Sequence, residues 1–304
     1  MADLINERKP TVMKSKLLLI SLLLCAINAH AAALDDAVAV IKIALVKQPT
    51  SHPFTVAYVP NYKRYYIADG GLGAVMDGYS IARSRSEIHT FSAKGEYINS
   101  IQGGLDNRSI YFNPNDNTLE TVTYNVSSGG GFTPDVGIYT LELDNTGNLT
   151  QQHAEKFSFN PAFGDAGVIP SFDNTTKGYY AKQSRSNKVF FVLLDKREPV
   201  SEILLDLKTA GVEFDDIADN YVAYTGIPNE ELAVLDIDHK AVLLFNLKGV
   251  FTGRSKLPSQ LKLHAQNHYS GLGYANGLFF VYNQNEGDFG TYYGFKVSDQ
   301  AVNQ

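Results

Sequence analysis

The sequence predicts an all-β protein built from one four-strand unit that recurs along the chain. Aromatic residues make up 12% of the 304 residues, with 18 Tyr and 17 Phe, and such residues favour half-buried strands. Gly, Asn and Asp gather in short runs that are typical of tight turns. Strand pairs shaped like EIHTFSAKGEYINSI (87–101) occur repeatedly. Together these three observations predict an all-β fold made of repeated units.

The first element is an N-terminal targeting segment. A basic start at residues 13–16 leads into an almost unbroken apolar run from Leu17 to Ile27, and Ala29-His30-Ala31 follows. This order is that of a secretory signal peptide, and the run is shorter than the roughly 20 residues that span a bilayer. We expect residues 1–31 to be an extension and signal peptide, cut after Ala31. Residues 32–304 are then a single domain, periplasmic or secreted.

Cysteine usage agrees with a domain that has no disulfide. The only cysteine, Cys25, lies inside the expected signal peptide. The residues before it, Leu23 and Leu24, are larger than those expected before a lipidated cysteine. We therefore expect the exported domain to depend on its hydrophobic core alone, which a chain of this length can provide.

The first repeat unit shows four strands in order, which we label a to d. Strand a is FTVAYV (54–59), and the turn Asn61-Tyr62-Lys63 leads into strand b. A long glycine-rich loop covers 70–86. Strands c and d then form a hairpin that turns at Lys94-Gly95.

Four further units follow the same scheme. Their b-strand landmarks lie 46 to 58 residues apart: Tyr66, Val122, Tyr180, Val234 and Phe280. A period near 50 with four strands per unit predicts a β-propeller. A β-sandwich is the alternative, because its short strands recur at a similar spacing. We expect five blades, with six if two units have been merged.

The ends of the chain complete the ring. The fifth unit has strands a, b and c only, and its missing d strand is available at residues 39–47, which are rich in β-formers. We therefore expect 39–47 to pair with 291–297 and close the propeller with the N-terminal strand. Closure of this kind removes an exposed sheet edge.

The first unit resembles the NHL repeat. Val59-Pro60, Tyr66-Ile67-Ala68-Asp69, and Ile88, Phe91 and Gly95 match its pattern, and 241–249 matches in part. Units two, three and five lack the Ala-Asp pair. The resemblance implies a propeller that serves mostly as an interaction or ligand-binding platform, with some enzymes among its members.

Loop lengths distinguish the two ends of the strands. The a–b and c–d turns are short, whereas the longer segments lie on the other face, at 70–86, 102–108, 125–136, 158–167, 206–219, 259–268 and 283–290. Long loops on a rigid scaffold commonly carry function, so we expect the site on the long-loop face.

Candidate ligand-binding residues lie in these segments or directly before them. Arginines suit carboxylates, aromatic rings suit sugars or peptides, and loop acids offer further polar contacts. The candidates are Asp69, Asp77, Arg83, Arg85, Arg108, Tyr124, Asp165, Asp215, His268 and Asp288.

Catalytic and metal chemistry has little support. None of the five expected inner strands contains an acid, which argues against propeller glycosidases and calcium-dependent lactonases. His264 and His268 are four apart but lie in an expected loop, where that spacing does not place them on one face. We expect no metal, no cofactor and no identifiable catalytic residue.

The predicted function is binding or scaffolding by an exported propeller, with a small molecule, glycan or protein as partner. Basic residues do not cluster, which argues against nucleic acid, and no segment after the signal peptide is apolar enough to span a membrane. The alternative is a propeller hydrolase or lyase acting on a sugar or lactone with loop acids.

Overall fold

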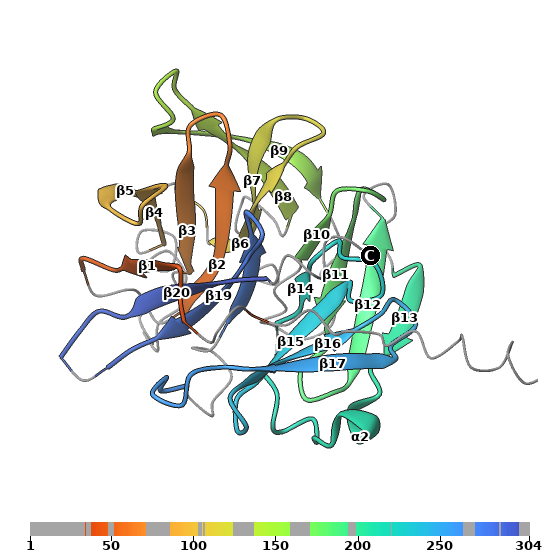
Figure 1. The fold of residues 1–304 in the computed structure, drawn as a ribbon. Coiled ribbons are helices and arrows are strands. Elements are labelled where there is room, and N and C mark those ends of the chain that lie inside the picture. The colour runs from red at the N-terminus through yellow and green to blue at the C-terminus, as the bar shows by residue number, and fades with distance from the viewer. Residues whose placement is uncertain are drawn as a thin grey trace, which may run out of the picture. The chain divides into compact units, whose positions relative to one another are not determined.

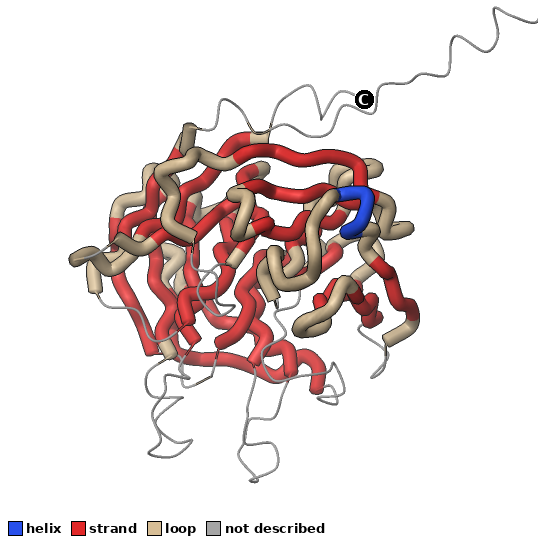
Figure 2. The backbone as a smooth tube through the Cα atoms, turned by 90° about the horizontal axis from the view of Figure 1, so that it is seen from below, coloured by secondary structure: helices blue, strands red, loops and turns tan. Residues whose placement is uncertain are grey.

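The computed structural model describes residues 34, 38–47, 52–70, 86–102, 105, 107–123, 137–158, 171–193, 199–219, 221–263, 271–285 and 287–297. Among them, strands supply nearly all regular structure, as Figure 2 shows. The short helix α2 (Leu207–Ala210) is capped by Asp206 at its start and by Gly211 at its end. No helix in these ranges has the length and apolar character needed to cross a membrane.

The described strands form five antiparallel sheets of four strands, which are the blades of a β-propeller (Figure 1). Blade 1 contains β2 (His52–Val59), β3 (Arg64–Gly70), β4 (Glu87–Ser92) and β5 (Tyr97–Gln102). Blade 2 contains β6 (Asn107–Asn113), β7 (Thr118–Thr123), β8 (Gly137–Leu143) and β9 (Leu149–Ser158). Each connects consecutive strands by hairpins, as the sequence predicts.

Blades 3 and 4 repeat this order. Blade 3 contains β10 (Ser171–Asp173), β11 (Gly178–Lys182), β12 (Lys188–Leu193) and β13 (Ser201–Leu204). Blade 4 contains β14 (Ala223–Tyr224), β15 (Leu232–Asp236), β16 (Ala241–Phe245) and β17 (Phe251–Lys256). The five-blade prediction is confirmed and the six-blade alternative is not needed.

Blade 5 joins the two ends of the propeller. It contains β18 (Leu272–Ala275), β19 (Leu278–Asn283), β20 (Thr291–Lys296) and, as its outermost strand, β1 (Ile41–Ala44). Ile41 pairs with Gly294 and Ala44 with Thr291, and Figure 1 shows β1 beside β20. The predicted closure by the N-terminal strand is therefore confirmed.

The first strands of the five blades form the inner ring. β2 contacts both β6 and β18, β10 contacts β6 and β14, and β14 contacts β18. Each blade therefore presents its a strand to the middle, and the d strand is the outermost. Among the described strands, the a strands are therefore the ones that surround the middle of the ring.

Five hydrophobic clusters hold the ring together, one in each seam between neighbouring blades. The seam between blades 5 and 1, for example, buries Ile43, Ile67, Phe91 and Phe280. Equivalent clusters fill the seams between blades 1 and 2, 2 and 3, 3 and 4, and 4 and 5. Most of the core thus lies between sheets, and burial of this apolar surface stabilises the closed arrangement.

Two c–d turns use glycine for close approach to the preceding blade. Gly95 (φ 84°) lies against the carbonyl of Lys42 in β1, and Gly249 (φ 77°) lies against the carbonyl of Leu204 in β13. A Cβ at either position would overlap that carbonyl oxygen. Both turns therefore need glycine for its backbone conformation and for space.

Candidate functional site

An aromatic residue occupies the same place in every inner strand. These residues are Tyr58, Phe112, Phe172, Tyr224 and Tyr274, and all five are half-buried. Each lies at the last or next-to-last paired position of its strand, opposite Tyr65, Leu119, Tyr179, Leu232 and Phe279. The five-fold arrangement of the blades therefore produces a ring of aromatic side chains around the middle.

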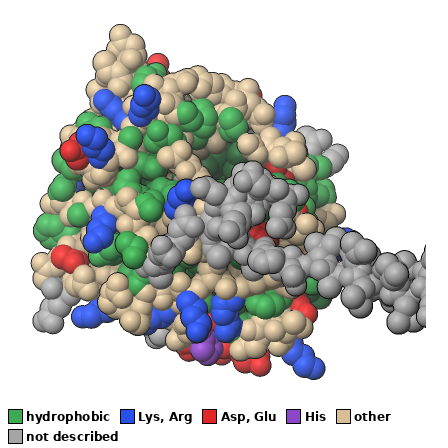
Figure 3. Space-filling view, viewed as in Figure 1, with side chains coloured by type: hydrophobic (Ala, Val, Ile, Leu, Met, Phe, Trp, Pro, Cys, Tyr) green, Lys and Arg blue, Asp and Glu red, His purple; other side chains and the backbone are tan. Residues whose placement is uncertain are grey.

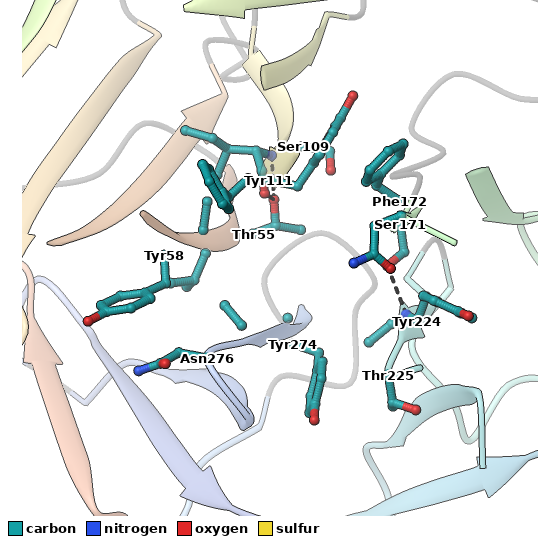
Figure 4. A pocket seen from close by; sticks show the side chains of 18 of the residues that line it. Thr55, Tyr58, Ser109, Tyr111, Ser171, Phe172, Tyr224, Thr225, Tyr274 and Asn276 are labelled. Atoms are coloured by element: carbon teal, nitrogen blue, oxygen red, sulfur yellow. Dashed lines mark hydrogen bonds between the residues drawn. The ribbon is translucent and has the colours of Figure 1, made fainter. Parts of the chain in front are cut away.

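These residues line one cavity of about 300 Å³ at the centre of the ring. Figure 4 shows that the rings of Tyr58, Tyr224 and Tyr274 extend outward from its middle along their blades. The aromatic groups therefore form the flared wall of a funnel and leave its centre open. We call this set of residues and the space they enclose the aromatic funnel.

Neighbouring rings fix the orientation of the funnel aromatics. Tyr58 packs on Tyr65 with ring centroids 4.8 Å apart, and Tyr274 packs on Phe279 at 5.1 Å. Tyr224 stacks on Tyr180 of blade 3 at 5.2 Å and 19°. These three rings are preorganised, because each is held by a ring of its own blade or of the preceding blade.

Small residues precede most of the aromatic positions. Ala57, Ser171, Ala223 and Gly273 line the same cavity. Because successive strand residues point to opposite faces, a small side chain here keeps the space between neighbouring blades narrow and the centre open. Blade 2 differs, because it has Tyr111 at this place.

A buried carboxylate holds Tyr111. Glu120 accepts a hydrogen bond from the Tyr111 hydroxyl at 2.7 Å, and it also accepts from Asn113 at 3.0 Å and from Lys156 at 2.6 Å. Tyr111 in turn stacks on Phe172 with centroids 4.7 Å apart. A charged network behind the wall thus fixes two of its aromatic rings.

Hydroxyl groups in the funnel are engaged within the protein. Thr55 Oγ1 accepts from the Ile110 amide at 2.7 Å and donates to the Ile110 carbonyl at 3.2 Å. Ser171 Oγ accepts from the Tyr224 amide at 2.8 Å, and Thr225 Oγ1 donates to the Glu230 carbonyl at 2.7 Å. These bonds join one blade to the next or brace a turn. The serine and threonine hydroxyls that make them therefore add little polar surface for a ligand.

The funnel wall is uncharged. No Asp, Glu, Lys, Arg or His is among the described residues that line the cavity. Burial raises the pKa of Tyr224 to about 12 and also raises the pKa of Tyr274. Both phenols therefore stay neutral at physiological pH. On the face seen in Figure 3, hydrophobic side chains surround the visible middle and most charged side chains lie nearer the margin.

The cavity reaches the short turns, which the sequence analysis did not anticipate. Its lining includes the first turn residues Pro60, Pro114, Asn174 and Gly226. The expectation of a site on the long-loop face did not consider the space that five short turns enclose together. The long loops at 71–85, 124–136, 159–170 and 264–270 lie outside the described residues.

Six of the ten candidate site residues also lie outside the described residues: Asp77, Arg83, Arg85, Tyr124, Asp165 and His268. Arg108 belongs to β6, but its side chain is likewise outside them. The prediction that these residues bind a ligand therefore remains a prediction.

The other three candidates lie in separate parts of the fold. Asp69 was expected among the loop acids, but it is in β3 and is 1% exposed, because the strand runs on to Gly70. Asp215 is exposed between α2 and β14. Asp288 is also exposed, and its Oδ1 accepts from the amides of Asn285 and Gly290, which braces its loop.

No group of three or more His, Cys, Asp or Glu is arranged to hold a metal within the described ranges. Asp216, next to Asp215, accepts from the Glu213 amide at 2.8 Å and so serves the local turn. Asp216 therefore has a structural role in this turn.

The funnel aromatics were not among the predicted site residues, although the sequence carries the signal. Strands TVAYV, SIYFN, PSFD, VAYT and LGYA each contain the aromatic residue at the same distance from the turn. Aligning the five inner strands on their turns would have revealed the column. Loop length alone, on which the site prediction was based, does not reveal this column.

Comparisons with known proteins do not assign a family to the chain. No family model matches the chain, and no curated protein matches it. A chain in the crystal structure of a nidogen–laminin complex is 15% identical, with a TM-score of 0.39, covering 73% of this chain and 67% of that one. A structural genomics protein of unknown function from Bacteroides thetaiotaomicron is 11% identical, with a TM-score of 0.46, covering 84% and 72%. The propeller assignment rests on the five sheets, and the NHL likeness remains a resemblance.

Proposed function

We propose that this protein is an exported binding protein that holds an uncharged, partly apolar small molecule in the aromatic funnel. The propeller fold itself supports a binding or scaffolding role. The observation that carries the finer proposal is the aromatic residue at the same place in all five inner strands. Each of the five rings packs against the hydrophobic cluster of one seam and also lines the central cavity, so every blade contributes an aromatic group to its wall.

The chemistry of the wall selects the class of ligand. Pockets of about 300 Å³ or more accommodate small molecules, and aromatic walls favour flat apolar faces such as those of aromatic compounds or neutral sugars. An ion would meet no opposite charge among the described lining residues. Charged ligands are therefore disfavoured, because their desolvation has no compensation.

The phenol groups of Tyr58 and Tyr274 provide the polar contacts. Within the described part of the chain neither hydroxyl has a hydrogen-bond partner, in contrast to Thr55 and Ser171. A ligand with an acceptor or donor at its edge fits between these neighbouring blades. The Asn276 amide beside them donates to Tyr65 at 3.0 Å and closes this side of the wall.

Export and the long-loop face belong to the same proposal. The basic start, apolar run and Ala-x-Ala site within residues 13–31 support secretion to the periplasm or beyond. The long segments that follow several strands support a second binding surface, for a glycan or protein, at Arg83, Arg85 and Tyr124.

The test is a binding screen on the purified protein. A panel of neutral aromatic compounds and neutral sugars, with charged analogues of each, is measured by thermal shift and then by calorimetry. We expect a neutral compound to bind, and Tyr274→Ala and Tyr58→Ala each to weaken it about tenfold, from the loss of one aromatic contact.

Tyr293→Ala is the matched control, since Tyr293 is a half-buried tyrosine of β20 outside the funnel lining. It should leave the affinity unchanged. Equal weakening by all three substitutions, or preference for the charged analogues, would contradict the proposal.

A further inference from the structure

Three polar side chains on successive strands of blade 1 form a hydrogen-bonded chain. His89 of β4 lies between Asp69 of β3 and Ser100 of β5. Its Nε2 is 3.3 Å from Asp69 Oδ2, and its Nδ1 is 2.7 Å from Ser100 Oγ. His89 and Ser100 are directly paired across the two strands, so the sheet register itself sets this geometry.

The direction of each hydrogen bond follows from the donors and acceptors present. The Asp69 carboxylate only accepts, so His89 Nε2 carries the proton and donates to it. When the ring carries this single proton, Nδ1 is an acceptor and the Ser100 hydroxyl donates to it. This is the tautomer in which a histidine can take the proton of a serine.

The environment favours a persistent arrangement. The side chains of His89 and Asp69 are 3% and 1% exposed, whereas Ser100 is half-buried and accessible from outside. Electrostatic interactions are stronger in such a dry setting than in water. The base and its carboxylate are thus protected, and the hydroxyl remains within reach of a substrate.

Tyr97 adds a donor beside the serine. Its hydroxyl is 3.1 Å from Ser100 Oγ, and because the serine proton is committed to His89, Tyr97 is the donor of this bond. The Phe91 ring packs edge-on against Tyr97 at 5.7 Å and fixes its position. Tyr97 and its neighbour Ile98 are 41% and 37% exposed, so they offer apolar surface next to the hydroxyl.

We propose that Ser100 is an activated nucleophile of an acyl-transfer site, with His89 as general base and Asp69 as the residue that positions it. The substrate class is a small uncharged ester whose acyl group rests on Tyr97 and Ile98. This site lies in the outer part of blade 1 and is separate from the aromatic funnel.

The chemical step uses only these groups and water. Ser100 Oγ attacks the ester carbonyl carbon while its proton moves to His89 Nδ1, and the Tyr97 hydroxyl turns to donate to the carbonyl oxygen. The carbon–alkoxy bond then breaks, and the alcohol leaves with the proton from His89. Water, deprotonated by His89, cleaves the Ser100 ester, which releases the carboxylic acid and restores the hydroxyl.

The test is covalent labelling of the full chain with an uncharged alkyl fluorophosphonate. Ser100 Oγ displaces fluoride from phosphorus, and mass spectrometry locates the adduct. We expect a single adduct on Ser100, none in Ser100→Ala, and labelling about 100-fold slower in Asp69→Asn, because general-base catalysis contributes on this scale. Tyr97→Phe should slow labelling less.

Matched variants separate activation from structure. Ser92→Ala changes another serine of the same hairpin, whose hydroxyl lies 3.2 Å from Glu96, and should label at the parent rate. Asp69→Glu should retain more labelling than Asp69→Asn, because it keeps a carboxylate. Melting curves confirm that each variant is folded.

Absence of an adduct on Ser100 in folded protein would overturn the proposal, and so would equal labelling rates in the parent and Asp69→Asn. In either case the chain from Asp69 to Ser100 would be a structural network that holds three strands. Failure here leaves the funnel proposal untouched, since the two sites share no residue.

Discussion

Two seams of the propeller use the same packing but different chain connectivity. Between blades 3 and 4, Gly249 lies against the Leu204 carbonyl of the outer strand β13. Between blades 5 and 1, Gly95 lies against the Lys42 carbonyl of the outer strand β1. The outer strands place Ile203 and Ile43 in the adjoining clusters.

The difference lies in what holds the outer strand. β13 follows β12 in the same blade, and the described residues are continuous from β13 into α2. β1 pairs with β20 although it comes from the other end of the chain. The two outer strands make similar contacts but should differ in how easily they detach. β1 can separate from β20 while the other three strands of blade 5 stay folded.

An aspartate in place of a buried isoleucine of each outer strand should have the largest effect and should distinguish the two seams most clearly. Ile43 is 0% and Ile203 is 9% exposed. Ile43→Asp and Ile203→Asp should each lower the free energy of unfolding by more than about 3 kcal/mol, because an unpaired carboxylate is buried. In Ile43→Asp, however, β1 should detach first, and limited proteolysis should cleave within 38–47 while blades 1 to 4 stay resistant.

Ile203→Asp provides the contrast, because β13 lies between β12 and α2 in the chain. Its cleavage within 199–206 should appear only with general unfolding. Simultaneous cleavage of all blades in Ile43→Asp would show that β1 is as firmly integrated as β13.

Alanine at the two docking glycines should have the next largest effect. Gly95→Ala and Gly249→Ala should each cost about 2–4 kcal/mol, because a Cβ overlaps a backbone carbonyl and the positive φ disfavours other residues. Urea denaturation measures both losses. Only Gly95→Ala should also increase proteolysis of β1.

Gly277→Ala separates backbone strain from overlap. Gly277 has a similar φ of 70°, but nothing lies within 4 Å of its Cβ position. It should lose only about 1 kcal/mol. A loss at Gly95 no larger than at Gly277 would mean that the turn moves away from β1 at little cost.

The smallest effect concerns a lysine in the seam between blades 3 and 4. Lys182 is fully buried and donates to the Asp219 carbonyl at 2.7 Å. Burial lowers its pKa to about 8, against about 10.4 in an unfolded chain. From pH 8 upward the unfolded chain therefore binds more protons at this site, and the free energy of unfolding should rise by about 2 kcal/mol between pH 7 and 9.5.

Lys182→Met removes the titrating group. The difference between parent and variant isolates its contribution, and the range ends below pH 10 because tyrosines such as Tyr224, with raised pKa values, act in the opposite direction. A difference that does not change with pH would show that Lys182 stays charged in the folded state.

The architecture was predictable because it repeats. Turn residues, strand lengths and the missing fourth strand of the last unit led from residues 39–47 to their pairing with 291–297, which β1 and β20 confirm. Such features depend on local composition and on the number of strands. They do not require knowledge of which side chains meet.

The site was less predictable because it depends on contacts between strands. The pairing of β4 with β5, which places His89 opposite Ser100, includes a register shift between Thr90 and Phe91. No local sequence pattern indicates this shift. Asp69 was taken for a loop acid because the end of β3 is set by its pairing with β4. The funnel aromatics become visible only when five distant strands are compared.

The closure by β1 also sets an order of events. Ile41 pairs with Gly294, so the earliest strand of the ring to be synthesised must wait for the last, about 250 residues later. Until then β1 lacks its partner strand, and another chain could pair with it. The ring can therefore close only when the whole chain has been made. A product that ends before β20 has no partner strand for β1, and its seam between blades 5 and 1 stays open.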